Sequence, residues 1–159
     1  MSKCVYAGSF DPITSGHLDI IERAAARFGD VSVVVPMNIE KKCAFLLEQR
    51  IDMIRKSTAH ISGVSVNSLD GLLVDYMKKI GADLIIRGLR SLSDFDHEYQ
   101  LASVNAKLYE DIETVFLMAN PKYSFISSSI VRELIFHGGD IKGFVPDFIV
   151  MDIKKYVGR

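Results

Sequence analysis

The stretch Lys3–His17, KCVYAGSFDPITSGH, decides the fold. Its apolar start at 3–7 predicts a buried β-strand, and the residues from Gly8 to His17 form a long connection to the next element. A helix follows, because apolar residues recur at helical spacing at Leu18, Ile21, Ala25 and Phe28. Gly29 is a typical place for that helix to stop. A strand, a loop and a helix in this order predict the first βα unit of an α/β protein.

The same alternation continues to the end of the chain. Further strands are expected at 31–35, 64–68, 84–87 and 114–118. Further helices are expected at 47–59, 72–80, about 94–109, 130–137 and 147–157. This pattern predicts the α/β class, with a Rossmann-like, doubly wound sheet of five parallel strands and helices on both faces. Such sheets bind ligands beyond the carboxyl ends of their strands, so the functional residues are expected just after the strands.

Composition and charge favour an ordinary globular protein with one domain over residues 1–159. Apolar residues make up 48% of the chain and charged residues 25%, which argues against disorder. A net charge of −1 argues against a nucleic-acid coat or a polybasic membrane binder. No apolar run approaches the ~20 residues of a membrane helix, and we expect no signal peptide. Cys4 and Cys43 make no disulfide framework or metal motif, so a reduced, cytoplasmic protein is expected. The charge and the short apolar runs lead us to expect no nucleic-acid or membrane partner.

The first loop carries residue types that suit phosphate binding. Gly8 lets the backbone approach a ligand, Ser9 offers a hydroxyl, and Gly16 and His17 fall where the helix begins. Unpaired N–H groups and the positive end of the helix dipole favour an anion there. That positive end also disfavours an imidazolium, so His17 is expected to be a neutral hydrogen-bond donor. The alternative is an ordinary βα loop in which His17 is a polar residue of the first helical turn.

Basic residues follow two of the expected strands. Lys41 and Lys42 come after the second strand, and Arg87 and Arg90 come after the fourth. Guanidinium groups there could bind phosphate oxygens in a bidentate way that lysine cannot match. The alternative is that they are solvated surface charges, although Arg87 directly ends a buried apolar run.

Two further features are compatible with a nucleotide. Ser127-Ser128-Ser129 precedes a helical pattern, so Ser128 or Ser129 is expected to cap that helix while the other hydroxyls bind phosphate. Glu98 lies in the fourth expected helix, where the alternative is an exposed position that shares a face with Asp94. No general-base role is expected for Glu98.

Several of these segments together resemble a known family. The loop Gly8–Pro12 and the tetrad Thr14-Ser15-Gly16-His17 look like the nucleotidyltransferase signature. With Lys41-Lys42, Arg87–Arg90, Tyr123–Ser129 and Gly138-Gly139-Asp140, the whole chain resembles the phosphopantetheine adenylyltransferases. That resemblance implies the joining of ATP to 4′-phosphopantetheine, which gives dephospho-coenzyme A and pyrophosphate. The chain departs from the family at Ser9, where threonine is frequent, and at His97, where an aromatic residue is common.

The resemblance also implies roles for individual residues. His17 and Lys41 would be catalytic, although the chemistry alone does not decide between Lys41 and Lys42. The phosphopantetheine substrate would contact Ser9, Lys41, Leu73 and Arg87, although the default for the Leu73 side chain is the core. The residues implied for ATP are Ser9, Phe10, His17, Gly88, Leu89, Arg90, Glu98, Tyr123, Ser124, Phe125, Ile126, Ser127, Ser128 and Ser129.

The expected chemistry needs no protein base or metal cage. Mg²⁺ would arrive with the ATP phosphates, because the sequence has no cluster of acidic ligands. The family suggests a homohexamer, with dephospho-coenzyme A as product and coenzyme A as a further ligand or regulator. Two alternatives stay open, namely a sister nucleotidyltransferase for another phosphate ester and a non-catalytic nucleotide sensor. Cytidylyl relatives typically carry Ile-Ser-Thr-Thr where this chain has Ile126–Ser129.

Overall fold

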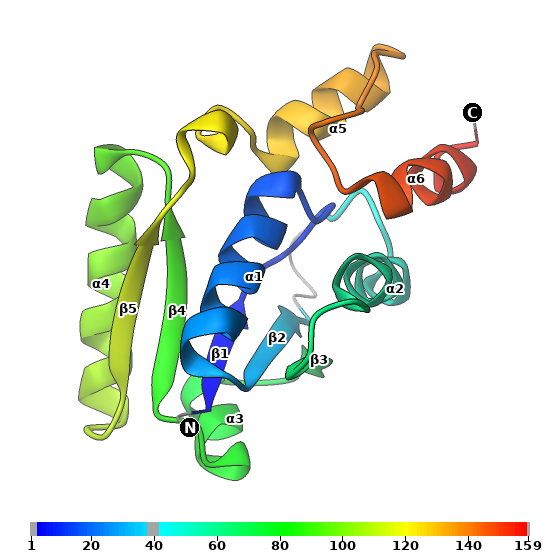
Figure 1. Cartoon of the computed structure of the whole chain (residues 1–159). Helices are drawn as coiled ribbons and strands as arrows, with labels where there is room; N and C mark the ends of the chain where they lie inside the picture. The colour runs from blue at the N-terminus through cyan, green and yellow to red at the C-terminus, as the bar shows by residue number, and fades with distance from the viewer. Residues whose placement is uncertain (1–2, 38–41, 159) are drawn as a thin grey trace.

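A five-stranded parallel sheet forms the centre of the molecule (Figure 1). The computed structural model describes residues 3–37 and 42–158. The strands are β1 (Cys4–Ala7), β2 (Val31–Pro36), β3 (Val64–Leu69), β4 (Leu84–Leu89) and β5 (Glu113–Met118). Their order is β3-β2-β1-β4-β5 and every neighbouring pair is parallel. The strand order therefore reverses between β1 and β4, which confirms the predicted doubly wound sheet and places a ligand site at their carboxyl ends.

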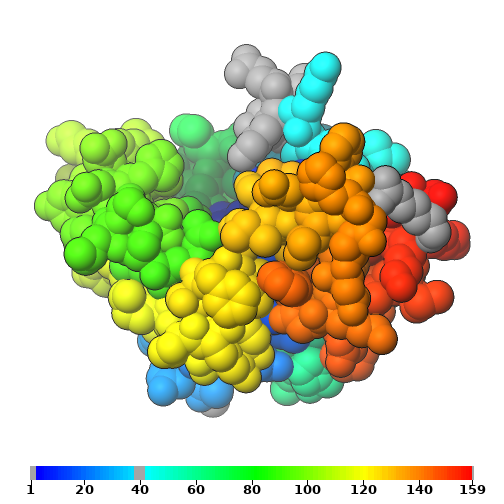
Figure 2. All heavy atoms as spheres, turned by 90° about the horizontal axis from the view of Figure 1, so that it is seen from above, coloured from blue at the N-terminus to red at the C-terminus, as the bar shows by residue number. Residues whose placement is uncertain are grey.

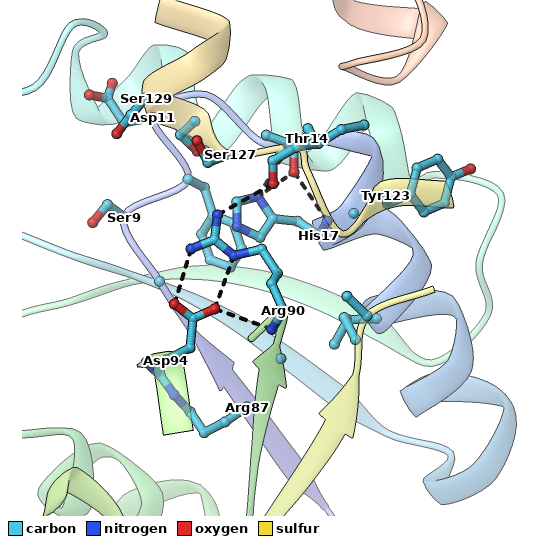
Figure 3. A pocket seen from close by; sticks show the side chains of 18 of the residues that line it. Ser9, Asp11, Thr14, His17, Arg87, Arg90, Asp94, Tyr123, Ser127 and Ser129 are labelled. Carbon is cyan, nitrogen blue, oxygen red and sulfur yellow. Dashed lines mark hydrogen bonds and ion pairs between the residues drawn. The ribbon is translucent and has the colours of Figure 1, made fainter. Parts of the chain in front are cut away.

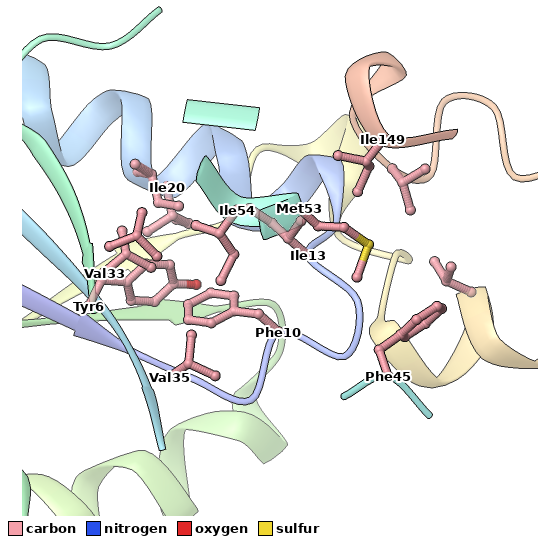
Figure 4. Packing of buried hydrophobic residues seen from close by; sticks show 14 of the residues in the cluster. Tyr6, Phe10, Ile13, Ile20, Val33, Val35, Phe45, Met53, Ile54 and Ile149 are labelled. Atoms are coloured by element: carbon pink, nitrogen blue, oxygen red, sulfur yellow. The ribbon is translucent and has the colours of Figure 1, made fainter. Parts of the chain in front are cut away.

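Helices pack on both faces of this sheet (Figure 1). They are α1 (Ser15–Phe28), α2 (Leu47–Thr58), α3 (Leu73–Ile80), α4 (Leu92–Leu108), α5 (Ser128–Phe136) and α6 (Val150–Tyr156), with 3₁₀ turns η1 (Pro121–Tyr123) and η2 (Asp147–Ile149). Residues of α1, α2, α5 and α6 build the larger core cluster, where Ile54, Met53 and Phe10 lie side by side (Figure 4). A smaller cluster on the opposite face takes Val74 and Met77 from α3.

Most boundaries agree with the predicted ones to within one or two residues, and three differences change where residues of interest lie. β4 continues to Leu89, so Gly88 and Leu89 lie inside the strand and pair with β5 residues instead of following the expected end at Arg87. α4 starts at Leu92, before the acidic residues, because the Ser91 side chain caps it by accepting from the Asp94 amide. The predicted last helix is divided into the 3₁₀ turn η2 and α6. Across the described ranges, no helix combines the length and apolar character needed to span a membrane.

Candidate active site

A cavity of about 420 Å³ opens at the carboxyl edge of β1 and β4. Its walls come from the β1–α1 loop, the end of β4, the first half of α4, and the segment from η1 to the start of α5. Figure 2 views this edge from above and shows blue N-terminal residues between green α4 and yellow-to-orange η1 and α5. The cavity therefore lies where the reversed strand order predicts a ligand site.

The start of α1 orients His17. Thr14 is the N-cap, and its hydroxyl accepts a hydrogen bond from the His17 amide at 3.3 Å. In return, Nδ1 of His17 accepts from the Thr14 amide at 3.1 Å (Figure 3). Because Nδ1 is an acceptor, a neutral ring carries its proton on Nε2. The cap thus selects the tautomer that can donate a hydrogen bond to a ligand in the cavity.

The surroundings of His17 favour its neutral form. Burial is the largest cause, and together with the positive charges of Arg90 and Arg87 it lowers the pKa of His17 to about 4. The expected neutral imidazole agrees with this shift. The main cause of the pKa shift is burial, whereas the prediction from the sequence relied on the helix dipole.

Arg87 is held in place by two acceptors. Its Nε and Nη2 donate to the two carboxylate oxygens of Glu98, and its Nη1 donates to the Ala7 carbonyl at 2.7 Å. The alternative of an ordinary exposed helix position for Glu98 is wrong, since its side chain is only 14% exposed. A guanidinium carries five N–H groups, and these contacts use three of them. Arg87 therefore keeps two N–H groups for an anion.

Arg90 links two walls of the cavity. Its guanidinium donates to both carboxylate oxygens of Asp94, at 3.2 and 3.4 Å (Figure 3). It also donates to the carbonyl of Ile126, at 3.4 Å, in the segment between η1 and α5. The end of β4 is thereby joined to the start of α5.

Ser127 caps α5, so the predicted capping by Ser128 or Ser129 is wrong. Ser127 has extended backbone angles and its hydroxyl accepts from the Ile130 amide at 3.1 Å. Ser128 is the first helical residue, and its hydroxyl donates to the Pro12 carbonyl at 2.8 Å. The Ser129 hydroxyl accepts from Arg132 at 3.1 Å. All three serines line the cavity, and Ser128 connects α5 with the β1–α1 loop.

The structure brings most of the predicted residues to one cavity. Lining it are Ser9, Phe10, His17, Arg87, Gly88, Arg90, Glu98, Tyr123, Ile126, Ser127, Ser128 and Ser129. Lys41 lies outside the described residues, whereas Lys42 lines the wall. His97, the departure from the family pattern, also lines the cavity.

Four predicted residues lie off the cavity wall. Leu73 packs against the smaller core cluster beneath the sheet, as its apolar default predicts. Leu89 is a buried residue of β4. The Ser124 hydroxyl bonds to the Pro121 carbonyl in η1, and Phe125 packs edge-on against Phe144. Packing explains the side chains of Leu73 and Leu89, and turn formation explains that of Ser124, whereas Phe125 is 60% exposed.

Sequence reasoning missed the residues that hold the site together. Asp11 accepts backbone hydrogen bonds from Ala44 and Phe45, and Arg132 donates to the Asp11 carbonyl. The sequence signal for Asp11 was its place beside Pro12 in the first loop, where an aspartate often bonds backbone amides. Nothing in the sequence around Arg132 indicated that its side chain would contact Asp11, more than a hundred residues earlier in the chain.

Comparison with known proteins identifies the family. The Cytidylyltransferase-like family matches residues 5–134. The phosphopantetheine adenylyltransferase of Finegoldia magna is 53% identical over 97% of this chain and 95% of its own length. Proteins of the same name from Dictyoglomus thermophilum and Clostridium novyi are each 50% identical, over 99% and 100% of this chain and 96% and 99% of their own lengths. The chain therefore belongs to the phosphopantetheine adenylyltransferase family.

Proposed function

We propose that the cavity catalyses the reaction of this family by direct in-line transfer. ATP and 4′-phosphopantetheine give dephospho-coenzyme A and pyrophosphate. The observation that carries the proposal is the convergence of His17, Arg87 and the α5 start on one cavity. Each of these groups presents N–H donors to an anion, and they come from three separate segments of the chain.

The attacking group in this reaction is a phosphate monoester oxygen. Its second pKa is about 6, so it is already ionised at neutral pH and needs no general base. Pyrophosphate leaves without a proton once its charge is neutralised. Catalysis then consists of aligning two anions that repel each other and stabilising the charge that develops at the α-phosphorus.

The proposed roles combine the donors on the cavity wall with the roles that the family resemblance implies for Lys41 and Ser9. Nε2–H of His17, together with Lys41, stabilises the developing charge, and Ser9 orients the phosphopantetheine phosphate. The two remaining N–H groups of Arg87 bind that same phosphate while Glu98 holds the guanidinium. Gly88, Arg90 and the cavity-lining residues from Tyr123 to Ser129 surround ATP. The side chains of Leu73, Leu89, Ser124 and Phe125 have no direct contact in this proposal.

Magnesium enters this proposal as part of the nucleotide. Within the described ranges, no three His, Cys, Asp or Glu residues group to hold a metal ion. The carboxylates on the wall are already engaged, Asp11 with backbone amides and Asp94 and Glu98 with arginines. This donor set suits a Mg²⁺ held by ATP phosphates and water, which neutralises phosphate charge.

We further propose a homo-oligomer, a hexamer by family resemblance. Support comes from α4, where none of the 17 residues is buried. Its exposed apolar side chains are Leu92, Phe95, Tyr99, Leu101, Val104 and Leu108. A helix with this many exposed apolar side chains is typical of an interface between subunits.

Other expectations also stay proposals. Residues 1–159 would act as one domain around the single described sheet. Two free cysteines, Cys4 and Cys43, support a reducing, cytoplasmic setting. Coenzyme A shares the pantetheine and adenylyl groups of the product dephospho-coenzyme A, so it would compete for the same cavity as a ligand or regulator.

Replacing His17 by alanine tests the function. We expect pyrophosphate release from ATP and phosphopantetheine to lose on the order of 10²–10³ in kcat, with a smaller effect on ATP binding, because a transition-state donor is removed. His60→Ala is the matched control, since His60 pairs with Glu22 on the surface. A near-normal kcat in His17→Ala would remove His17 from the mechanism, and no pyrophosphate from the wild type would reject the function.

Replacing Arg87 by lysine tests the substrate phosphate site. Lysine has three N–H groups, so it cannot bond both Glu98 oxygens and the Ala7 carbonyl and still offer further N–H groups to a phosphate. We expect the KM for phosphopantetheine to rise by about tenfold or more, with a smaller change in the KM for ATP. Arg55→Lys on α2, whose guanidinium contacts the Val66 carbonyl, is the control. An unchanged KM for phosphopantetheine would contradict the assignment.

The protonation of His17 is open to direct measurement. Its pKa is lowered in the folded protein, from 6.5 to about 4. The stability that the neutral ring contributes is therefore complete above pH 6.5 and is lost as the pH falls toward 4. We expect NMR of the free protein to show the His17 ring neutral, with the proton on Nε2, at pH 6. A titration midpoint at or above 6.5 would show that the burial argument is wrong.

A further inference from the structure

Asp11 connects three segments that each contribute to the cavity wall. It follows Ser9 and Phe10 in the β1–α1 loop, and its side chain is only 8% exposed. Its two carboxylate oxygens accept from the amides of Ala44 and Phe45, at 2.8 and 2.9 Å. These amides belong to no helix or strand, and they directly follow Lys42 and Cys43, which line the cavity. The carboxylate thus holds the base of the lysine-bearing segment against the phosphate-binding loop.

The third segment is α5, which contacts Asp11 through Arg132. Nη1 of Arg132 donates to the Asp11 carbonyl at 2.7 Å and lies 3.7 Å from its carboxylate. Nη2 of the same guanidinium donates to the Ser129 hydroxyl. Figure 3 shows Asp11 and Ser129 next to each other at one side of the pocket. Asp11 is therefore fixed directly to the segment before α2 and, through Arg132, to Ser129 in α5.

The loop beside Asp11 needs such support. Phe10 has a φ of 46°, in the left-handed region that residues other than glycine seldom adopt. Arg50, itself buried, donates to the Ser9 carbonyl at 2.7 Å on the other side of Phe10. A backbone in this region persists where its surroundings hold it on both sides. The contacts of Ser9 and Asp11 supply that support.

We propose that Asp11 is a positioning residue that acts through the cationic segment after β2. It does so by holding the amides of Ala44 and Phe45, so that Lys42 on the cavity wall is fixed relative to His17. The inference rests on the proposed function. Asp11 has no direct contact with the reacting phosphates in this proposal, since both its oxygens are occupied by backbone amides.

A double-mutant cycle tests whether Asp11 acts through the lysines. Asp11→Asn keeps the size of the side chain and exchanges one acceptor for a donor that faces an amide. We expect kcat to fall by on the order of 10- to 100-fold, because a displacement of about 1 Å in a catalytic group costs this much. In a Lys41→Ala/Lys42→Ala background the same substitution should change kcat by less than about twofold. Equal losses in both backgrounds would overturn the proposal.

Amide hydrogen exchange tests the hydrogen bonds from Ala44 and Phe45 to Asp11 without a measurement of enzyme activity. In the wild type, the amides of Ala44 and Phe45 should exchange slowly despite lying outside helices and strands, and rapid exchange would overturn the proposal. In Asp11→Asn their exchange should accelerate, while β1 and β4 amides keep their protection. Asp152→Asn, which alters only an ion pair of Asp152 with Lys56, is the control. Failure of this inference and failure of the proposed function are distinguishable. Rapid exchange of the Ala44 and Phe45 amides overturns the inference, whereas absence of product with the wild-type protein overturns the proposed function.

Discussion

Repulsion between two phosphate groups is the constraint on which the whole site depends. Both substrates of the family's reaction carry multiple negative charges, and they react only if those charges are neutralised in a fixed arrangement. The protein supplies N–H donors from a histidine, from arginines and from a helix start, all around one cavity. Donors fixed before the substrates arrive need no reorganisation when charge develops, which makes them effective in the transition state.

Positive charge at such a site has to be stabilised before any ligand binds. Glu98 pairs with Arg87 and Asp94 pairs with Arg90, so neither guanidinium lies unpaired at the cavity wall. His17 avoids the same cost by staying neutral, in agreement with its lowered pKa. The carboxylates thus form ion pairs with the arginines and hold them in place, which explains why acidic residues line a site for polyanions.

The sheet topology and most of the cavity could be predicted from the sequence. Short runs rich in β-branched residues, separated by helical patterns, predicted the five strands. The rule for reversed strand order then placed Gly8, His17 and Arg87 at one edge of the sheet. Contacts between distant segments could not be predicted, because Asp11 with Ala44 and Arg132 with Asp11 depend on how loops pack. The cap of α5 was misplaced by one or two residues, since three consecutive serines offer equal propensity and only backbone angles distinguish them.

The central claim is that phosphate attacks phosphate directly, with the protein acting only through alignment and charge. The most direct measurement is the stereochemical outcome at the α-phosphorus, with ATP made chiral at that atom by isotopic substitution. A single in-line displacement predicts inversion of configuration in dephospho-coenzyme A. Retention would reveal two successive displacements through an adenylylated side chain, and it would contradict the account.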